Sequence, residues 1–149
     1  MSNTCFDLTQ RPPRSPRQQL GGFVILPRML DKARATIAGK NGEYNYACPL
    51  DQRFLEFTGI NPESLKEQIA TGKGDGDILK WIDENSTTKP DAVKVESWSN
   101  LMARRAPADV ESRQFFNEQQ AKYGLLREDI VTWFDLLDLD DFVSFGGKA

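Results

Sequence analysis

The chain has 149 residues, a net charge of −3 and no histidine, and its aromatic residues are spread along its length. This length is typical of one folded domain, and the apolar content argues against global disorder. The mild negative charge argues against a whole-domain nucleic-acid binder. The absence of histidine excludes Ser-His-Asp and Cys-His catalysis and any histidine-ligated metal site.

The N-terminal sequence has no charged start followed by an apolar run, and no apolar run approaches the roughly 20 residues that span a bilayer. The two cysteines, Cys5 and Cys48, are too few for a disulfide scaffold or a zinc site. We therefore expect a soluble, cytoplasmic protein with no metal and no cofactor. Neither nucleic acid nor a membrane is expected among its partners.

Residues 1–20 contain the segment Arg11-Pro12-Pro13-Arg14-Ser15-Pro16-Arg17, which predicts an extended arm. The arm either wraps over the protein surface or offers a basic, proline-rich ligand to a protein partner. Cations dominate before residue 41, and carboxylates dominate from residue 128 onward. The basic head and the acidic tail either meet in the fold or each face a partner.

The first helix is predicted over 27–38, with Pro27 at its first position and Gly39 just after its end. At about 100° per residue the apolar and charged side chains separate into two arcs. One arc holds Met29, Leu30, Ala33 and Ile37, and the other holds Arg28, Asp31, Lys32 and Arg34.

The sequence Asn41-Gly42 predicts a turn, and the alternation over 43–47 predicts a short extended segment, so we expect one short β pair near 43–47. Asp51 is expected to cap a helix through Phe57. Asn61-Pro62 predicts a helix that reaches Ala70.

Four further helices are expected in the second half of the chain. Asp77 should cap a helix over 78–84, and Thr88 should cap one that extends to Arg105. The remaining two cover 109–123 and 128–137, and residues 138–145 are expected to be extended. The predicted fold is mainly α, a single domain over 21–149 with six or seven short helices, preceded by the arm over 1–20.

Two motifs carry a resemblance to a known family. They are Leu26-Pro27-Arg28-Met29-Leu30-Asp31-Lys32-Ala33-Arg34-Ala35 and Tyr44-Asn45-Tyr46-Ala47-Cys48-Pro49-Leu50-Asp51, and the segment from Trp81 and the later Trp98 also fit. The chain resembles, over most of its length, small bacterial proteins grouped as domain of unknown function 5069. The resemblance implies a bacterial, cytoplasmic protein and implies no activity.

Several motifs do not support a catalytic or metal site. The glycine-rich loop over 72–77 matches neither phosphate-binding spacing nor a calcium loop, so it is interpreted as a helix-to-helix turn. The carboxylates over 135–141 are interpreted as an acidic, solvated rim rather than a catalytic pair. Cys48 is interpreted as a small buried side chain that reacts slowly with alkylating reagents, although a nearby cation would activate it.

The start of the first helix is the strongest candidate for a binding site. Leu26 cannot cap the N–H groups of Arg28 and Met29, so either an anion or a carboxylate such as Asp51 must accept from them, unless the helix begins earlier. The candidate ligand-binding residues are Arg28, Asp31, Lys32, Arg34, Tyr44, Tyr46, Cys48 and Asp51.

Two functions are compatible with these residues. The first is a non-enzymatic binding or interaction domain for a small anionic ligand or a protein. The alternative is a small enzyme that acts on a phosphorylated or carboxylated metabolite through Lys, Arg, Tyr and Asp side chains. A concave pocket that joins Arg28, Lys32 and the tyrosines would favour the enzyme.

Overall fold

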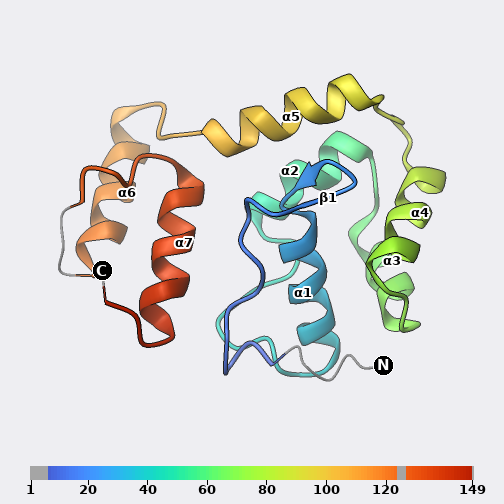
Figure 1. Ribbon diagram of the computed structural model, residues 1–149, viewed down its shortest axis with the longest axis horizontal. Helices are drawn as coiled ribbons and strands as arrows, with labels where there is room; N and C mark the ends of the chain where they lie inside the picture. Colours follow the sequence, from blue (N-terminus) through green and yellow to red (C-terminus); the bar gives the residue numbers. More distant parts are fainter. Residues whose placement is uncertain (1–6, 124–126, 149) are drawn as a thin grey trace.

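The computed structural model describes residues 7–123 and 127–148. A central helix, α1 (Leu26–Ile37), is surrounded by the other elements, and α5 crosses above it (Figure 1). The α3 and α4 helices lie on one side of α1, and α6 and α7 lie on the other. The fold is a mainly α single domain, as the sequence predicts.

The described part of the chain contains seven helices and one short antiparallel strand pair. None of these helices is long and apolar enough to cross a membrane. The elements besides α1 are β1 (Gln19–Leu20), β2 (Phe23–Val24), α2 (Pro49–Thr58), α3 (Pro62–Ala70), α4 (Asp75–Asn85), α5 (Ala92–Arg104), α6 (Val110–Ala121) and α7 (Trp133–Ser144).

The strand pair lies at 19–24 and not near 43–47, so its predicted position is wrong. Leu20 pairs with Phe23, and the two intervening glycines, Gly21 and Gly22, have φ angles of 61° and 86°. Positive φ at both central residues is the geometry of a tight hairpin turn, which glycine adopts without strain. Residues 43–47 form turns instead.

The α1 helix is buried on nearly all sides. Its apolar arc is enclosed at Met29, Leu30 and Ala33, each 0% exposed, and becomes exposed only at Ile37 in the last turn. The charged arc is enclosed as well, because Arg28 and Lys32 are each 3% exposed. Periodicity correctly separates the two arcs, but it does not show that both are covered.

The apolar arc of α1 packs into the main core. Phe23 of β2 meets Phe54 of α2 edge to face, with ring centroids 5.1 Å apart, and Trp98 of α5 stacks on Phe57 at 4.9 Å. Such ring pairs add about 0.5–1.5 kcal/mol each beyond their buried area. The core therefore joins the strand pair, α1, α2 and α5.

The start of α3 agrees with the sequence prediction, whereas other predicted helix starts do not. The α3 helix begins after Asn61, whose side chain accepts from the N–H of Ser64 at 2.9 Å. Three predicted caps are wrong. The α2 helix begins at Pro49 with Cys48 as its N-cap, so Asp51 lies in its first turn. The α4 helix begins at Asp75, so Asp77 lies in its first turn, and α5 is capped by Asp91 rather than Thr88.

The C-terminal helix differs most from the prediction. It spans 133–144, so the predicted helix over 128–137 is wrong at its start, and the predicted extended segment over 138–145 is mostly helical. The reason is the capping box of Thr132 and Asp135, in which each side chain accepts from the other residue's backbone N–H. That local signal places the first turn after Thr132.

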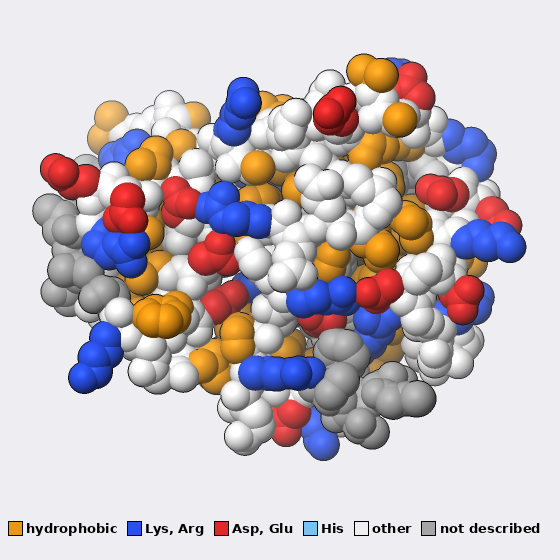
Figure 2. All heavy atoms as spheres, in the orientation of Figure 1, with side chains coloured by type: hydrophobic (Ala, Val, Ile, Leu, Met, Phe, Trp, Pro, Cys, Tyr) orange, Lys and Arg blue, Asp and Glu red, His pale blue; other side chains and the backbone are white. Residues whose placement is uncertain are grey.

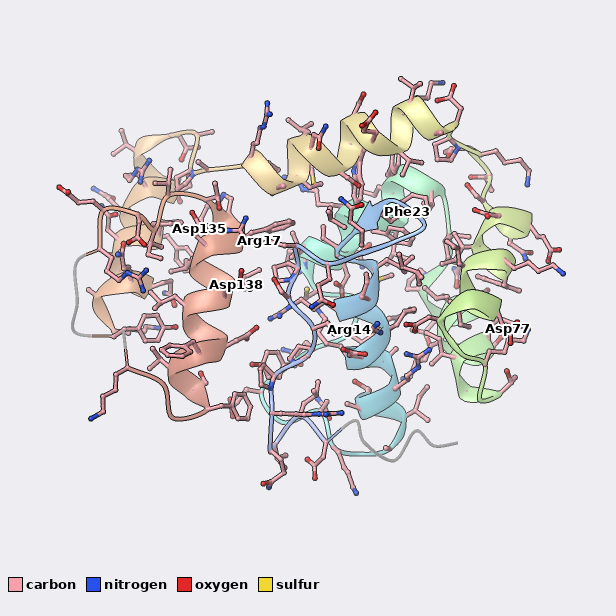
Figure 3. All side chains as sticks on the ribbon, viewed as in Figure 1. Arg14, Arg17, Phe23, Asp77, Asp135 and Asp138 are labelled. Carbon is pink, nitrogen blue, oxygen red and sulfur yellow. The ribbon has the colours of Figure 1, made fainter. Side chains whose placement is uncertain are left out.

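The basic arm meets the acidic tail within the fold. Arg17 forms ion pairs with Asp135 and Asp138 of α7, and Figure 3 shows these three side chains side by side. Ser15 donates to Asp138 at 2.8 Å. Arg14 forms ion pairs with Asp31 of α1 and Asp75 of α4 at 3.0 and 2.8 Å. The opposite charges at the two ends of the sequence therefore hold the arm against the domain.

Candidate functional site

A cleft of about 960 Å³ is bounded by α1, the loop before α2, and the α6–α7 pair. This volume is within the range of small-molecule sites, about 300–1,000 Å³. The side chains that carry chemistry on its walls are Arg28, Lys32, Tyr44, Cys48, Lys122 and Tyr123.

Arg28 joins α1 to α7 at one end of the cleft. Its Nη1 donates to Asp141 Oδ2 at 2.7 Å, and its Nη2 donates to Oδ1 of the same carboxylate at 3.3 Å. The hydroxyl of Tyr44 donates to Asp141 Oδ1 at 2.7 Å, and the guanidinium lies 5.5 Å from the centre of the Tyr44 ring. One carboxylate thus holds two of the candidate residues together.

The protonation of this cluster follows from burial and from Asp141. Burial opposes the charge on Arg28, but the bonds to Asp141 outweigh it, so the pKa of Arg28 is raised. Burial and the neighbouring Asp141 carboxylate both raise the pKa of Tyr44 above its ordinary value. At neutral pH Arg28 is therefore a charged guanidinium and Tyr44 a neutral phenol.

Lys32 lies one helical turn after Arg28 and forms the second cluster. Its Nζ is 2.9 Å from Asp51 Oδ2 and donates to Cys48 Sγ at 3.2 Å. Asp51 is 0% exposed, and its Oδ1 is a buried polar atom without a hydrogen-bond partner in the described part of the chain. The charge of Lys32 balances a carboxylate that cannot reach solvent.

Local backbone geometry brings Cys48 and Asp51 to this position. Ala47 has a φ of 61°, and its N–H donates to Asp51 Oδ2 at 2.9 Å. Cys48 is the N-cap of α2, and Pro49 is the first residue of that helix. The turn therefore places the thiol at the cleft wall, with the carboxylate of Asp51 close to Lys32 in the interior.

The predicted site residues divide into two groups. Four of them line the cleft, namely Arg28, Lys32, Tyr44 and Cys48, and Asp51 pairs with one of these. Three others do not line it. Asp31 pairs with Arg14, Arg34 pairs with Asp75 at 2.8 Å, and the Tyr46 hydroxyl donates to the carbonyl of Pro62 at 2.7 Å.

The start of α1, which the sequence singles out, is enclosed. The helix begins one residue earlier than predicted, at Leu26, and its N-cap is Ile25, which has a φ of 75° and 0% exposure. The Ile25 carbonyl accepts from the N–H of Met29 at 2.9 Å, and the Ile25 N–H donates to Pro16. The cations of this helix are paired with carboxylates of the protein.

The sequence did not identify Asp141, the partner that completes the Arg28 cluster. Asp141 lies 113 positions from Arg28, on a stretch expected to be extended and solvated. The only signal was the contrast between a basic head and an acidic tail. In residues 7–123 and 127–148, no three His, Cys, Asp or Glu side chains are grouped so that they could hold a metal ion.

Surface charge on the face shown in Figure 2 is mixed, with Lys and Arg side chains interspersed among Asp and Glu. A continuous basic patch, the usual sign of nucleic-acid binding, is not visible on that face.

A family model described as a domain of unknown function (DUF5069) matches residues 10–143. The matched region includes Arg28, Lys32, Tyr44, Cys48 and Asp141. No curated protein matches the chain.

Proposed function

We infer a function from the cleft itself, since the chain belongs to the DUF5069 family, whose description assigns no activity. We propose that the protein binds a small polar metabolite that carries carboxylate or phosphate oxygens. The single observation that carries this proposal is the cleft that joins Arg28, Lys32, Tyr44 and Cys48.

The chemistry of the ligand follows from the donors that the protein leaves unused. A guanidinium has five N–H donors and an ammonium has three. Arg28 spends two N–H groups on Asp141 and one on the carbonyl of Arg14. Lys32 is engaged by Asp51 and Cys48, which leaves one further N–H. Both side chains line the cleft, so a ligand with oxygen acceptors would satisfy the remaining donors.

The internal ion pairs limit how strongly a charged ligand is attracted. The cations Arg28, Lys32 and Lys122 line the cleft together with the carboxylates of Glu43 and Asp140. The ligand is therefore recognised by the directions of its hydrogen bonds rather than by a large net charge. The cleft joins Arg28 and Lys32 to Tyr44 but not to Tyr46, whose hydroxyl donates to the Pro62 carbonyl, so the criterion for an enzyme is met only in part. This arrangement supports a specific binding module more than a general anion trap.

A thiol enzyme is the second candidate, and one contact favours it. Lys32 Nζ donates to Cys48 Sγ at 3.2 Å, so negative charge that develops on the sulfur would meet a donor already in place. Alkylation distinguishes the two functions. In a Cys5→Ser background, slow labelling of Cys48 by iodoacetamide supports the binding module, and rapid stoichiometric labelling supports the enzyme.

Binding is tested by a thermal-shift screen of carboxylated and phosphorylated metabolites, followed by NMR titration of each compound that stabilises the protein. A compound at 100 times its Kd stabilises the fold by about 2.7 kcal/mol. We expect chemical-shift changes at residues 42–50 and at the cleft-facing residues of α6 and α7.

A matched pair of variants places the ligand in the cleft. Asn45 is exposed and lines the cleft, so Asn45→Trp should block it without disturbing the buried clusters. Asn117 on α6 is also exposed and lies outside every cavity described here, so Asn117→Trp should leave binding intact. Equal ligand binding by Asn45→Trp and Asn117→Trp would contradict the proposal that the ligand binds in the cleft.

The sequence also leads us to propose a bacterial, cytoplasmic protein. The resemblance carried by the two motifs around Arg28 and Tyr46 supports this location. Immunodetection in fractionated cells of the source organism tests it, and recovery in a membrane or secreted fraction would contradict it.

A further inference from the structure

A second, smaller cavity of about 380 Å³ adjoins the cleft and has a different character. Its wall is largely apolar and aromatic, and it carries two arginines and one carboxylate. The carboxylate is that of Asp140, which also lines the cleft and accepts from the Tyr123 hydroxyl. The residues that matter are Leu50, Arg53, Arg105, Phe115, Trp133 and Leu137. We call it the Arg53–Arg105 groove. Leu50 and Leu137 line both the groove and the cleft.

The two arginines differ from the other arginines that organise the fold. Arg14, Arg17 and Arg28 each form an ion pair with a carboxylate. Within residues 7–123 and 127–148, neither the Arg53 nor the Arg105 side chain forms an ion pair. Burial and the positive charge of Arg53 both lower the pKa of Arg105, so the two guanidinium groups repel each other.

The apolar wall is also only partly covered. Phe115 is 52% exposed, and its ring lies 6.3 Å from that of Trp133. An exposed aromatic ring and two guanidinium groups that form no ion pair with the described residues are suited to a ligand with an apolar body and an anionic end. The fork of a guanidinium matches a carboxylate in particular, because two parallel N–H groups meet its two oxygens.

We propose that the Arg53–Arg105 groove binds a small organic acid, with its carboxylate between the two guanidinium groups and its apolar or aromatic body against Leu50, Leu137 and Trp133. The bound carboxylate relieves the repulsion between the arginines. This site uses charged groups that the cleft does not use, so it goes beyond the binding function proposed above.

NMR titration with 4-phenylbutyrate and with its neutral amide, 4-phenylbutyramide, tests the proposal. The two probes have the same apolar body and differ in charge. We expect saturable shifts at the Trp133 indole N–H and at the amides of Leu50 and Leu137. The acid should bind at least roughly tenfold more tightly than the amide, because a hydrogen bond to a charged group is worth more than a neutral one.

Variants assign the effect to the two arginines. Arg53→Gln and Arg105→Gln should each weaken binding of the acid by roughly tenfold and leave binding of the amide unchanged. Arg104→Gln is the matched control, since Arg104 neighbours Arg105 in the chain, is exposed and does not line the groove. It should bind the acid as tightly as the unmodified protein.

Four results would overturn the proposal. The first is equal affinity for acid and amide, and the second is equal loss in Arg104→Gln and Arg105→Gln. The third is loss of binding in Asn45→Trp together with full binding in Arg53→Gln. That result would place the probe in the cleft and would support only the binding function proposed for the cleft. Burial of the groove in a dimer, seen by light scattering together with probe exclusion, would likewise replace the acid by a second copy of the chain.

Discussion

The guanidinium of Arg28 and the carboxylate of Asp141 form a two-bond ion pair, at 2.7 and 3.3 Å, across 113 positions of the sequence. Their side chains are only 4% and 9% exposed. This contact attaches α7 to the central helix, and Arg28 also lines the cleft. The same contact therefore belongs to both the stability of the fold and the shape of the proposed site.

Removing one member of the Arg28–Asp141 pair should lower the free energy of unfolding substantially. Arg28→Met and Asp141→Leu each leave a buried charge without its partner, which typically costs about 3–5 kcal/mol. The double variant should be less destabilised than the sum of the single changes, because it leaves no lone charge. Urea unfolding of the four proteins measures this coupling, and strictly additive losses would show that the pair is not a unit.

The attachment of the N-terminal arm should contribute more to stability through Arg14 than through Arg17. Figure 3 places these two residues at separate points along the arm. Arg14→Gln removes the charged partner of the Asp31 carboxylate, whose side chain is only 4% exposed to solvent. Arg17 is 44% exposed, and exposed ion pairs contribute about 0–1 kcal/mol. We expect Arg14→Gln to cost more than about 1.5 kcal/mol and Arg17→Gln less than about 1 kcal/mol in chemical denaturation.

Acid should weaken the contact between the arm, α1 and α4. Burial raises the pKa of Asp75, but the hydrogen bonds from Arg14 and Arg34 outweigh it and hold the pKa below its ordinary value of 3.8. A lowered pKa in the folded state stabilises the protein above about pH 4. That stability is lost as the pH falls through the folded pKa.

The Asp75→Asn variant tests this pH dependence. Its free energy of unfolding should fall less steeply than that of the unmodified protein when the pH drops below about 4. Asp77 lies on the same turn of α4, is exposed and points away from the arm in Figure 3. Asp77→Asn should therefore retain the full pH dependence, and a flattened profile in this control would assign the effect elsewhere.

Substitutions at Gly39 and Gly59 distinguish the cost of backbone strain from the cost of steric overlap. Gly39 and Gly59 follow the ends of α1 and α2 with φ angles of 71° and 70°. A Cβ at Gly39 has nothing within 4 Å, whereas a Cβ at Gly59 would overlap Oγ1 of Thr87. Gly39→Ala should cost about 1 kcal/mol from conformation alone, and Gly59→Ala distinctly more.

Thermal unfolding measures the difference between these two variants. Adding Thr87→Ala to Gly59→Ala should recover part of the loss, since the overlapping atom is then gone. Equal melting temperatures for Gly39→Ala and Gly59→Ala would show that the loop around Thr87 moves aside without cost.

Much of the secondary structure follows from short-range chemistry. The α3 helix lies where Asn61 and Pro62 predict it, and α2 ends at Gly59 in the left-handed conformation that glycine tolerates. The beginning of α7 was missed although its Thr132–Asp135 capping box is also local. The run of apolar residues over 130–134 suggested an earlier start than the cap permits.

The candidate site was predictable only in part. Arg28, Lys32, Tyr44 and Cys48 lie on two neighbouring motifs, and these residues meet in one cleft. Asp31 and Arg34 share the charged arc of α1 with Arg28 and Lys32. They pair instead with Arg14 and Asp75 and do not line the cleft. Helical periodicity places side chains on an arc, but it cannot tell which neighbour covers each part of that arc.

By itself, the sequence determined the mainly α class, the amphipathic character of the first helix and the exclusion of histidine chemistry. These conclusions depend on residue type and on spacing over a few positions. Only the tertiary structure decided that Arg28 and Lys32 are buried and which carboxylates neutralise them. It also decided that Arg53 and Arg105 form no ion pair within residues 7–123 and 127–148. The physical reason is distance along the chain: Arg28 meets Asp141 because packing brings α1 and α7 together, and no local preference encodes that meeting.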